Sequence, residues 1–458
     1  MKLETKHKIA IIFIAAVAVR ILFGFGLFFN HNSLVSYTGD AADYLNTAGN
    51  FLYKGIWSAS PVDPEPDNFR TPIYPLFLLF FYRFNISFNY AGFVQDLIMA
   101  ITAVLIYVLG RKIFSEKAVF PAAVFFALNP YLASSFISKA IMTEAFVIFF
   151  LVISLFNLGI YIAYKKSGNL YYGSVFLALA ALTKPQFFFF GVFLFLAVFF
   201  AGEQKIIKRF IYAGLIFLTM LSPWLYYNFF VLKVFQFSSN PLAALYQDTG
   251  FFQEFLKGGH GPAYNDYTWD RAKERLGVDH DAQLFEPHRA RKLAKSGIEF
   301  IRKNLFWFVV YDIVSIPRLF WHDTTVDAII HDFGIDSAVL GPGGMDINAV
   351  KNIFRGEFYA AAGELRTHPI WYFSLFLKLT TLLASGLALL NFFLQWKFNE
   401  TFPKNSLFLL LFILLYAAIV SPLGQQRYRA PISPFMAILA FDSIRLIYLR
   451  RLSHKISI

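Results

Sequence analysis

Residues 9–29 read IAIIFIAAVAVRILFGFGLFF, an apolar run close to the amino terminus of the 458-residue chain. A helix needs about 20 apolar residues to cross the hydrocarbon core of a bilayer, so this run predicts a membrane span. It is long for a signal peptide and no small-residue cleavage site follows it, so we expect it to be retained. Similar runs recur along a chain that is 57% hydrophobic and only 15% charged. The sequence therefore predicts an all-α, polytopic membrane protein.

The expected spans follow these apolar runs. They cover residues 9–29, 90–112, 117–136, 142–164, 169–184, 185–202, 206–231, 370–396, 405–424 and 430–449. The segment 304–321 is also apolar, but it contains Asp312, Pro317 and Arg318 and carries tryptophans near both ends, which is typical of headgroup depth. We interpret it as interfacial or re-entrant, because a crossing there would reverse the orientation of every later span. A further span at 72–84 would restore that orientation, so we expect about ten to twelve transmembrane helices.

The net charge of +12 raises the question of nucleic-acid binding, but the placement of the basic residues argues against it. With the amino terminus inside, the basic clusters all fall in cytoplasmic segments, which is the positive-inside pattern of membrane proteins. These clusters are Lys2, Lys6 and Lys8; Arg111, Lys112 and Lys117; Lys165 and Lys166; Lys205, Lys208 and Arg209; Arg450, Arg451 and Lys455. The absence of cysteine excludes disulfides and thiolate metal ligands. We therefore expect membrane lipids, and no nucleic acid, as partners.

This topology divides the chain into three parts. They are an amino-terminal transmembrane module, residues 1–231, with a first outer loop at 30–89; an extracytoplasmic region of mixed structure, residues 232–368; and the last transmembrane helices, residues 369–458. The first outer loop contains two expected interfacial helices, at Asp40–Lys54 and Thr71–Phe84, because apolar residues recur there at helical spacing. Helical stretches such as Asp281–Lys303 are expected in the outer region.

The polar stretch Tyr37-Thr-Gly-Asp-Ala-Ala-Asp-Tyr44 opens the first of these interfacial helices. Asp40 is expected at the outer membrane edge, where an acidic residue is a candidate for function. An aspartate before an amphipathic helix also commonly caps it, and spacing alone supports both roles equally. Asp43, one turn further on, suits a favourable charge at the start of the helix.

Several cations are expected on the outer side, against the positive-inside trend. Arg427 and Arg429 flank Tyr428 just before the last span, Lys184 occupies a tight outer turn, and Arg70 closes the first loop. Such arginines can anchor a helix in the headgroup layer, but their guanidinium forks also match phosphate oxygens. Several cations on one face favour an anionic, membrane-bound substrate.

Other polar residues give weaker signals. Glu144 begins a span, where a glutamate is also an ordinary partner of the helix dipole. The outer histidines and neighbouring aspartates (His260, His322, His331, Asp266, Asp323 and Asp332) show no metal-ligand spacing, so no metal site is predicted. Nucleotide-binding and serine-hydrolase motifs are absent from the sequence.

Taken in order, short motifs run from the first span to the last. They are Gly39-Asp-Ala-Ala-Asp-Tyr44, Asn50-Phe-Leu-Tyr-Lys-Gly-Ile-Trp-Ser58, Arg70-Thr-Pro-Ile-Tyr-Pro75, Met142-Thr-Glu144, Leu182-Thr-Lys-Pro185, Ser222-Pro-Trp224 with Asn228, and Arg427-Tyr-Arg-Ala-Pro431 with Pro434. This order and spacing resemble the multi-spanning GT-C glycosyltransferases that use polyprenyl-phosphate sugars. These include protein O-mannosyltransferases and the bacterial aminoarabinose and Rgt-type transferases. The chain departs from the pattern at Tyr227, where members of the family often carry an arginine.

The resemblance implies an inverting transfer of a sugar from a polyprenyl phosphate to a lipid, glycan or protein acceptor. It places the active site on the outer face of the plasma membrane, the inner membrane in bacteria. It implies Asp40 as the general base and four cations, Lys184, Arg427, Arg429 and Arg70, as ligands of the donor phosphate. It further implies substrate contacts from Asp43, Tyr44, Tyr74, Glu144 and Tyr428. No cofactor is assigned, and dependence on a divalent cation is left open.

Three other functions remain open at this point. A lipid or glycan transporter or flippase would also have many spans, but it would usually show broken helices or an internal repeat around charges at mid-depth. A polysaccharide polymerase or ligase would centre on an outer loop between late spans. A noncatalytic membrane subunit is the third alternative, which the departure at Tyr227 keeps open.

Overall fold

The computed structural model describes residues 3–31, 33–37, 39–62, 64–257, 266–321, 331–333, 370–399, 403–420 and 426–456. These residues form helices and loops, with one isolated parallel bridge between Ser36 and Ala140. Across the described ranges the prediction of an all-α protein is therefore confirmed. The three-part division of the chain stays a prediction, since much of 232–368 lies outside them.

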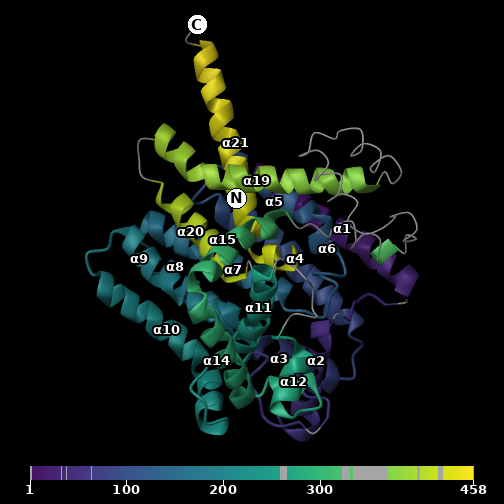
Figure 1. Ribbon diagram of the computed structural model, residues 1–458. Coiled ribbons are helices and arrows are strands. Elements are labelled where there is room, and N and C mark those ends of the chain that lie inside the picture. Colours follow the sequence, from purple (N-terminus) through teal and green to yellow (C-terminus); the bar gives the residue numbers. More distant parts are fainter. Residues whose placement is uncertain are drawn as a thin grey trace.

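The elements of the amino-terminal half follow most of the expected spans, with an exception at 117–136. They are α1 (Leu3–His31), α2 (Gly39–Lys54), α3 (Ile73–Arg83), α4 (Asn89–Gly110), α5 (Glu116–Leu128), α6 (Pro130–Ala133), α7 (Glu144–Tyr164), α8 (Ser167–Thr183), η1 (Pro185–Gly191), α9 (Val192–Ala201), α10 (Ile206–Tyr226) and η2 (Tyr227–Val231). The later elements are α11 (Asn240–Leu256), α12 (Trp269–Leu276), α13 (Asp281–Leu284), α14 (Pro287–Lys303), α15 (Leu305–Trp321), α19 (Ile370–Asn399), α20 (Lys404–Val420), η6 (Gln426–Ile432) and α21 (Ser433–Ile456). Helix α21 projects at one end of the molecule, and α2, α3 and α12 lie at the other (Figure 1).

Among the described residues, six helices are long and apolar enough to cross a membrane. These are Glu4–His31, Asn89–Gly110, Glu144–Tyr164, Ile206–Val231, Phe376–Phe398 and Arg427–Arg450. Shorter apolar helices cover Ile73–Arg83, Pro185–Ala201, Leu305–Pro317 and Lys404–Val420. The chain is thus a helical membrane protein, while the expected number of ten to twelve spans stays a prediction.

The segment 117–136 was expected as one span, and this was wrong. Helix α5 ends at Leu128, and the backbone of Asn129 is extended. The Asn129 side chain then accepts the main-chain N–H of Leu132 and caps the short helix α6, which begins at Pro130. A residue that precedes proline is disfavoured in helical conformation, which explains the break. The same effect at Pro287 divides the expected helix 281–303 into α13 and α14.

Two later segments bear on the expected topology. Segment 304–321 forms one helix, α15, with Pro317 inside it, and its interfacial position stays a prediction. Helix α19, which covers the expected span 370–396, lies across α21 (Figure 1). The side chain of Asn391 holds this crossing by donating to the main-chain carbonyl of Leu439 at 3.0 Å.

Helix α7 lies at the centre of the packing. It packs against α4, α8, α9 and α20, and most of its side chains are buried. Its first residue, Glu144, is fully buried at the end nearest the first outer loop. The chain bends between α8 and η1 at Lys184, whose backbone is extended because Pro185 follows it. This break leaves the Lys184 side chain free to reach Glu144.

Candidate active site

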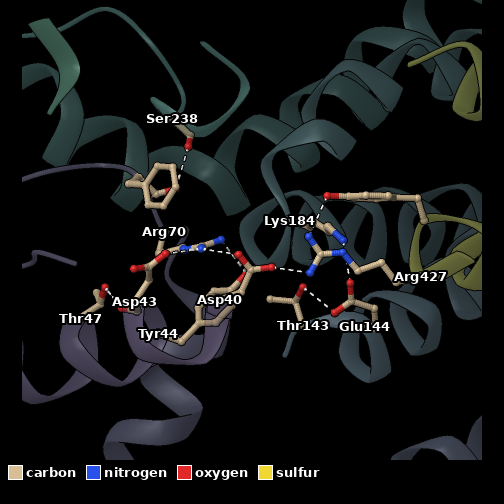
Figure 2. A network of polar contacts seen from close by, with 12 residues as sticks. Asp40, Asp43, Tyr44, Thr47, Arg70, Thr143, Glu144, Lys184, Ser238 and Arg427 are labelled. Carbon is tan, nitrogen blue, oxygen red and sulfur yellow. Dashed lines mark hydrogen bonds and ion pairs between the residues drawn. The ribbon is translucent and has the colours of Figure 1, made fainter. Parts of the chain in front are cut away.

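Asp40 lies at the junction of three segments that are far apart in the sequence. Its Oδ1 accepts from Arg70 Nη2 at 3.0 Å, and its Oδ2 accepts from Arg427 Nη1 at 2.6 Å (Figure 2). Helix α2 begins at Gly39, so Asp40 stands within its first turn. Because both carboxylate oxygens bind guanidinium groups, these contacts favour the role in a site over the role of a helix cap.

Arg70 is the most enclosed cation of this group, with a side chain only 7% exposed. Besides Asp40, it donates to Asp43 Oδ2 at 2.5 Å and to the Tyr44 hydroxyl at 3.2 Å. The guanidinium also lies 4.4 Å from the centre of the Tyr44 ring. Three residues of one face of α2 therefore fix a single arginine by charge and by cation–π contact.

The loop before Arg70 is held by a second buried aspartate that the sequence did not single out. Asp67 accepts the main-chain N–H groups of Ala59 at 2.8 Å and Phe69 at 2.9 Å. Burial raises the pKa of Asp67 to about 6, although these hydrogen bonds oppose the shift. Tyr227, the departure from the family motif, donates to the Asp67 carbonyl at 3.2 Å. Tyr227 thus tethers this loop to η2.

Lys184 and Glu144 form the second half of the network. Lys184 Nζ lies 2.9 Å from Glu144 Oε1, and Glu144 is fully buried. The Tyr428 ring is close to both cations, with its centre 5.1 Å from Lys184 Nζ and 4.9 Å from the Arg427 guanidinium. Arg427 also donates to the Tyr428 hydroxyl at 3.0 Å. Figure 2 shows Asp40 between the Arg70 side and the Lys184 side of the site.

The pKa values of the two aspartates of this network shift in opposite directions. Burial alone raises the pKa of Asp40, but the charges of Arg70 and Arg427 outweigh it and hold that pKa well below its usual range. Burial raises the pKa of Asp43, and its contact with Arg70 only partly offsets the shift. Three carboxylates thus face three cations, and the set is neutral when all are ionised.

These side chains line a cavity of about 630 Å³ whose lining combines polar and apolar residues. Eight of the ten residues expected in the site line it: Asp40, Asp43, Tyr44, Arg70, Glu144, Lys184, Arg427 and Tyr428. Helix α11 closes another side of the cavity with Asn240, Gln247 and Asp248. A cavity of this size is large enough for a sugar and its phosphate.

Tyr74 and Arg429 are the two expected site residues that are not among the described lining residues of this cavity. Tyr74 is fully buried, packs edge-on against the Tyr44 ring at 5.0 Å and donates to Gln95 Oε1 at 2.6 Å. Arg429 Nη1 donates to the main-chain carbonyls of Leu319 and Phe320 at the end of α15. In the compact turn of η6, Arg427 and Arg429 therefore contact different parts of the protein.

Asp248 is a lining residue that sequence reasoning missed. Burial, together with the charge of Asp312, raises the pKa of Asp248 to about 7. Its Oδ1 has no hydrogen-bond partner among the described residues. In the sequence, Asp248 stands out only as an acidic residue within the mainly apolar segment 240–256, and this pattern is too common to indicate a site.

The described residues contain no group of three or more histidine, aspartate and glutamate side chains arranged to hold a metal. His331 and Asp332 are described; they contact each other, with Nδ1 3.0 Å from Oδ1. His260, His322 and Asp323 lie outside the described residues.

One family model matches part of this chain. Residues 64–227 match the family model of dolichyl-phosphate-mannose-protein mannosyltransferases. This range contains Arg70, Glu144 and Lys184, whereas Asp40 and Arg427 lie beyond it. No curated protein sequence matches the chain.

Two solved structures of oligosaccharyltransferase from Archaeoglobus fulgidus have a similar fold. The first is AglB in complex with an inhibitory peptide and a dolichol-phosphate, with 13% identity and a TM-score of 0.52 over 99% of this chain and 51% of that one. The second is a complex with Zn and sulfate, with 13% identity and a TM-score of 0.50 over 97% of this chain and 49% of that one. The chain spans about half the length of these proteins. The match to the mannosyltransferase family model confirms the resemblance to GT-C glycosyltransferases, and the two structures confirm the fold alone.

Proposed function

We propose that this chain transfers a sugar from a polyprenyl-phosphate carrier to a lipid, glycan or protein acceptor. The reaction takes place on the outer face of the plasma membrane, the inner membrane in bacteria, with inversion at the anomeric carbon. The observation that carries the proposal is the position of Asp40, whose carboxylate lies between Arg70 and Arg427 in a cavity that also contains Lys184.

The cations suit a phosphate leaving group. In the transfer, the bond between the anomeric carbon and the phosphate oxygen breaks, and its electron pair stays on the lipid phosphate. Preplaced positive groups that meet such developing charge are usually the largest source of rate enhancement. Arg70, Arg427 and Lys184 all line the cavity, so their side chains can reach a donor phosphate held there. Arg429, bound to carbonyls of α15, is assigned a positioning role for η6 instead.

Asp40 acts as the base that removes the proton of the attacking acceptor hydroxyl or amine. A general base contributes about a hundred- to ten-thousand-fold to a rate, and it works best when its pKa lies near the operating pH. The two arginines lower the pKa of Asp40 and make it a weak base before substrate binds. A donor phosphate competes for Arg427, and loss of that contact raises the pKa of Asp40. Donor binding thus prepares the base.

The remaining cavity residues suit contacts with the sugar and the acceptor. Asp43 and Glu144 each use one carboxylate oxygen on a cation, at 2.5 Å from Arg70 and 2.9 Å from Lys184. Tyr44 and Tyr428 add ring faces and hydroxyl groups to the lining. Aromatic faces of this kind can stack on a sugar ring, and carboxylates can accept hydrogen bonds from the sugar hydroxyl groups.

The test compares wild type with Asp40→Asn, using a panel of polyprenyl-phosphate sugars and native membrane extract as acceptor. Asp270→Asn is a matched control, because its side chain is 91% exposed on α12. We expect Asp40→Asn to lose transfer while retaining donor binding, and the control to retain both. Equal transfer by Asp40→Asn and wild type would exclude Asp40 as the base. Donor binding without transfer by wild type, across the whole panel, would instead favour a transporter or a noncatalytic subunit.

A further inference from the structure

A second group of buried charges lies away from the candidate active site, in a groove between α1 and α4. The groove has a volume of about 600 Å³ and an almost entirely apolar lining. Three charged side chains are also part of the lining, namely Arg20, Asp96 and Lys139. None of the three belongs to the network around Asp40.

Arg20 is 1% exposed, yet much of its hydrogen-bonding capacity is unused. Its Nη1 donates to the main-chain carbonyls of Ala16 at 2.9 Å and Ala127 at 3.3 Å. Its Nε and Nη2 have no hydrogen-bond partner among the described residues. A buried donor without a partner costs about 1–3 kcal/mol, and more when it is charged. Two guanidinium nitrogens without a partner beside the groove therefore indicate a missing acceptor.

Lys139 and Asp96 supply the other charges. They form a buried ion pair, and Lys139 lies against α1 at Gly24. A Cβ atom at Gly24 would stand 3.0 Å from Lys139 Nζ, so glycine leaves room for the amine there. Two cations and one carboxylate give the groove a net charge of +1. An unbalanced charge in this setting is costly, which favours a bound anion.

The groove opens at the surface of the helix bundle. Phe25, Phe93 and Leu97 are each about half-exposed and form its apolar rim. Arg20 is eleven residues before His31, where α1 ends, so it lies roughly 16 Å along the helix from that end. Buried arginines at such depth draw water and headgroups inward by thinning the bilayer locally.

We propose that this groove binds one anionic glycerophospholipid, with its phosphodiester on Arg20 and Lys139 and its acyl chains along the apolar rim. The single net negative charge of such a lipid balances the net charge of the groove, whereas a zwitterionic phospholipid brings a second cation with its phosphodiester. A polyprenyl phosphate fits less well, because a phosphate monoester carries a charge of about −1.5 to −2 at neutral pH. This lipid is a structural ligand between α1 and α4. The inference does not rest on the proposed glycosyl transfer.

The test is native mass spectrometry of the full chain with phosphatidylglycerol, phosphatidylcholine of the same acyl chains, and undecaprenyl phosphate. We expect wild type to bind phosphatidylglycerol roughly tenfold or more tightly than phosphatidylcholine, because hydrogen bonds to charged groups contribute about 1.5–3 kcal/mol. Arg20→Met should abolish the preference and Arg20→Lys should retain it. Arg83→Met, at an exposed arginine that ends α3, is the matched control and should leave it unchanged.

Leu97→Trp provides a second variant, which fills the groove without removing a charge. It should lower phosphatidylglycerol binding even if Arg20→Met fails to fold. An unchanged preference in Arg20→Met or in Leu97→Trp would overturn the proposal, since the bound lipid would then be annular. Displacement of phosphatidylglycerol by an equal concentration of undecaprenyl phosphate would also overturn it, in favour of the monoester.

Discussion

Replacing Arg427 by methionine tests the link between the donor phosphate and the base. The side chain is 26% exposed, and its Nη1 lies 2.6 Å from Asp40 Oδ2. Removing one preplaced group that stabilises a developing anion typically lowers kcat by about 10²–10³-fold. We expect a loss of that size in sugar transfer by Arg427→Met. Arg427→Lys keeps the charge but loses the fork that joins Asp40 to Tyr428, so its loss should be smaller.

The pH profile of the same variant carries a second, independent expectation. Burial raises the pKa of Asp40, and the charges of Arg70 and Arg427 together bring it below the usual range. Wild type should therefore keep its base ionised at acid pH, and the acid limb of kcat/KM should lie below the ordinary carboxylate range. Without Arg427 the pKa rises, and the acid limb should move to higher pH. Radiolabelled sugar transfer measured from about pH 3 to 8 would show this shift, as a fall in the rate of the variant at a pH where wild type is still fully active. An unchanged acid limb, or a transfer rate equal to wild type, would refute the reasoning.

Three further predictions concern stability. Lys184→Met leaves the buried Glu144 without its cation, so it should lower the free energy of unfolding by about 3–5 kcal/mol. Adding Glu144→Gln should restore most of the lost stability. A double variant no more stable than the single one would contradict this prediction. Burial raises the pKa of Asp248 from 3.8 to about 7, so the contribution of this carboxyl group to stability falls as pH rises between these values. Asp248→Asn should therefore stabilise the protein more at pH 8 than at pH 5, with a difference of about 2 kcal/mol in the free energy of unfolding; equal effects at both pH values would argue against it. Tyr227→Phe removes a hydrogen bond and should cost about 1 kcal/mol in a denaturation assay, with donor turnover unchanged; reduced turnover would indicate a direct role in the site.

Much of the fold followed from the sequence because a bilayer imposes a length and an apolar composition on each span. The expected spans 9–29, 90–112 and 142–164 correspond to α1, α4 and α7 within a few residues. The exception at 117–136 came from Asn129 and Pro130, where local backbone preference overrides the apolar run. The order of the short motifs likewise indicated a resemblance to GT-C glycosyltransferases, and the comparisons confirm this resemblance.

What the sequence could not decide is which charged groups meet. Asp40 and Arg427 are 387 positions apart in the sequence, and only the tertiary structure brings their side chains within 2.6 Å. The same turn directs Arg429, two residues on, to the carbonyls of α15. Likewise, nothing in the sequence reveals that Arg20 keeps two free donors in an apolar groove. Hydrophobic burial acts on whole helix faces and can be predicted from composition, whereas a hydrogen bond depends on a few tenths of an ångström and is decided by the tertiary structure.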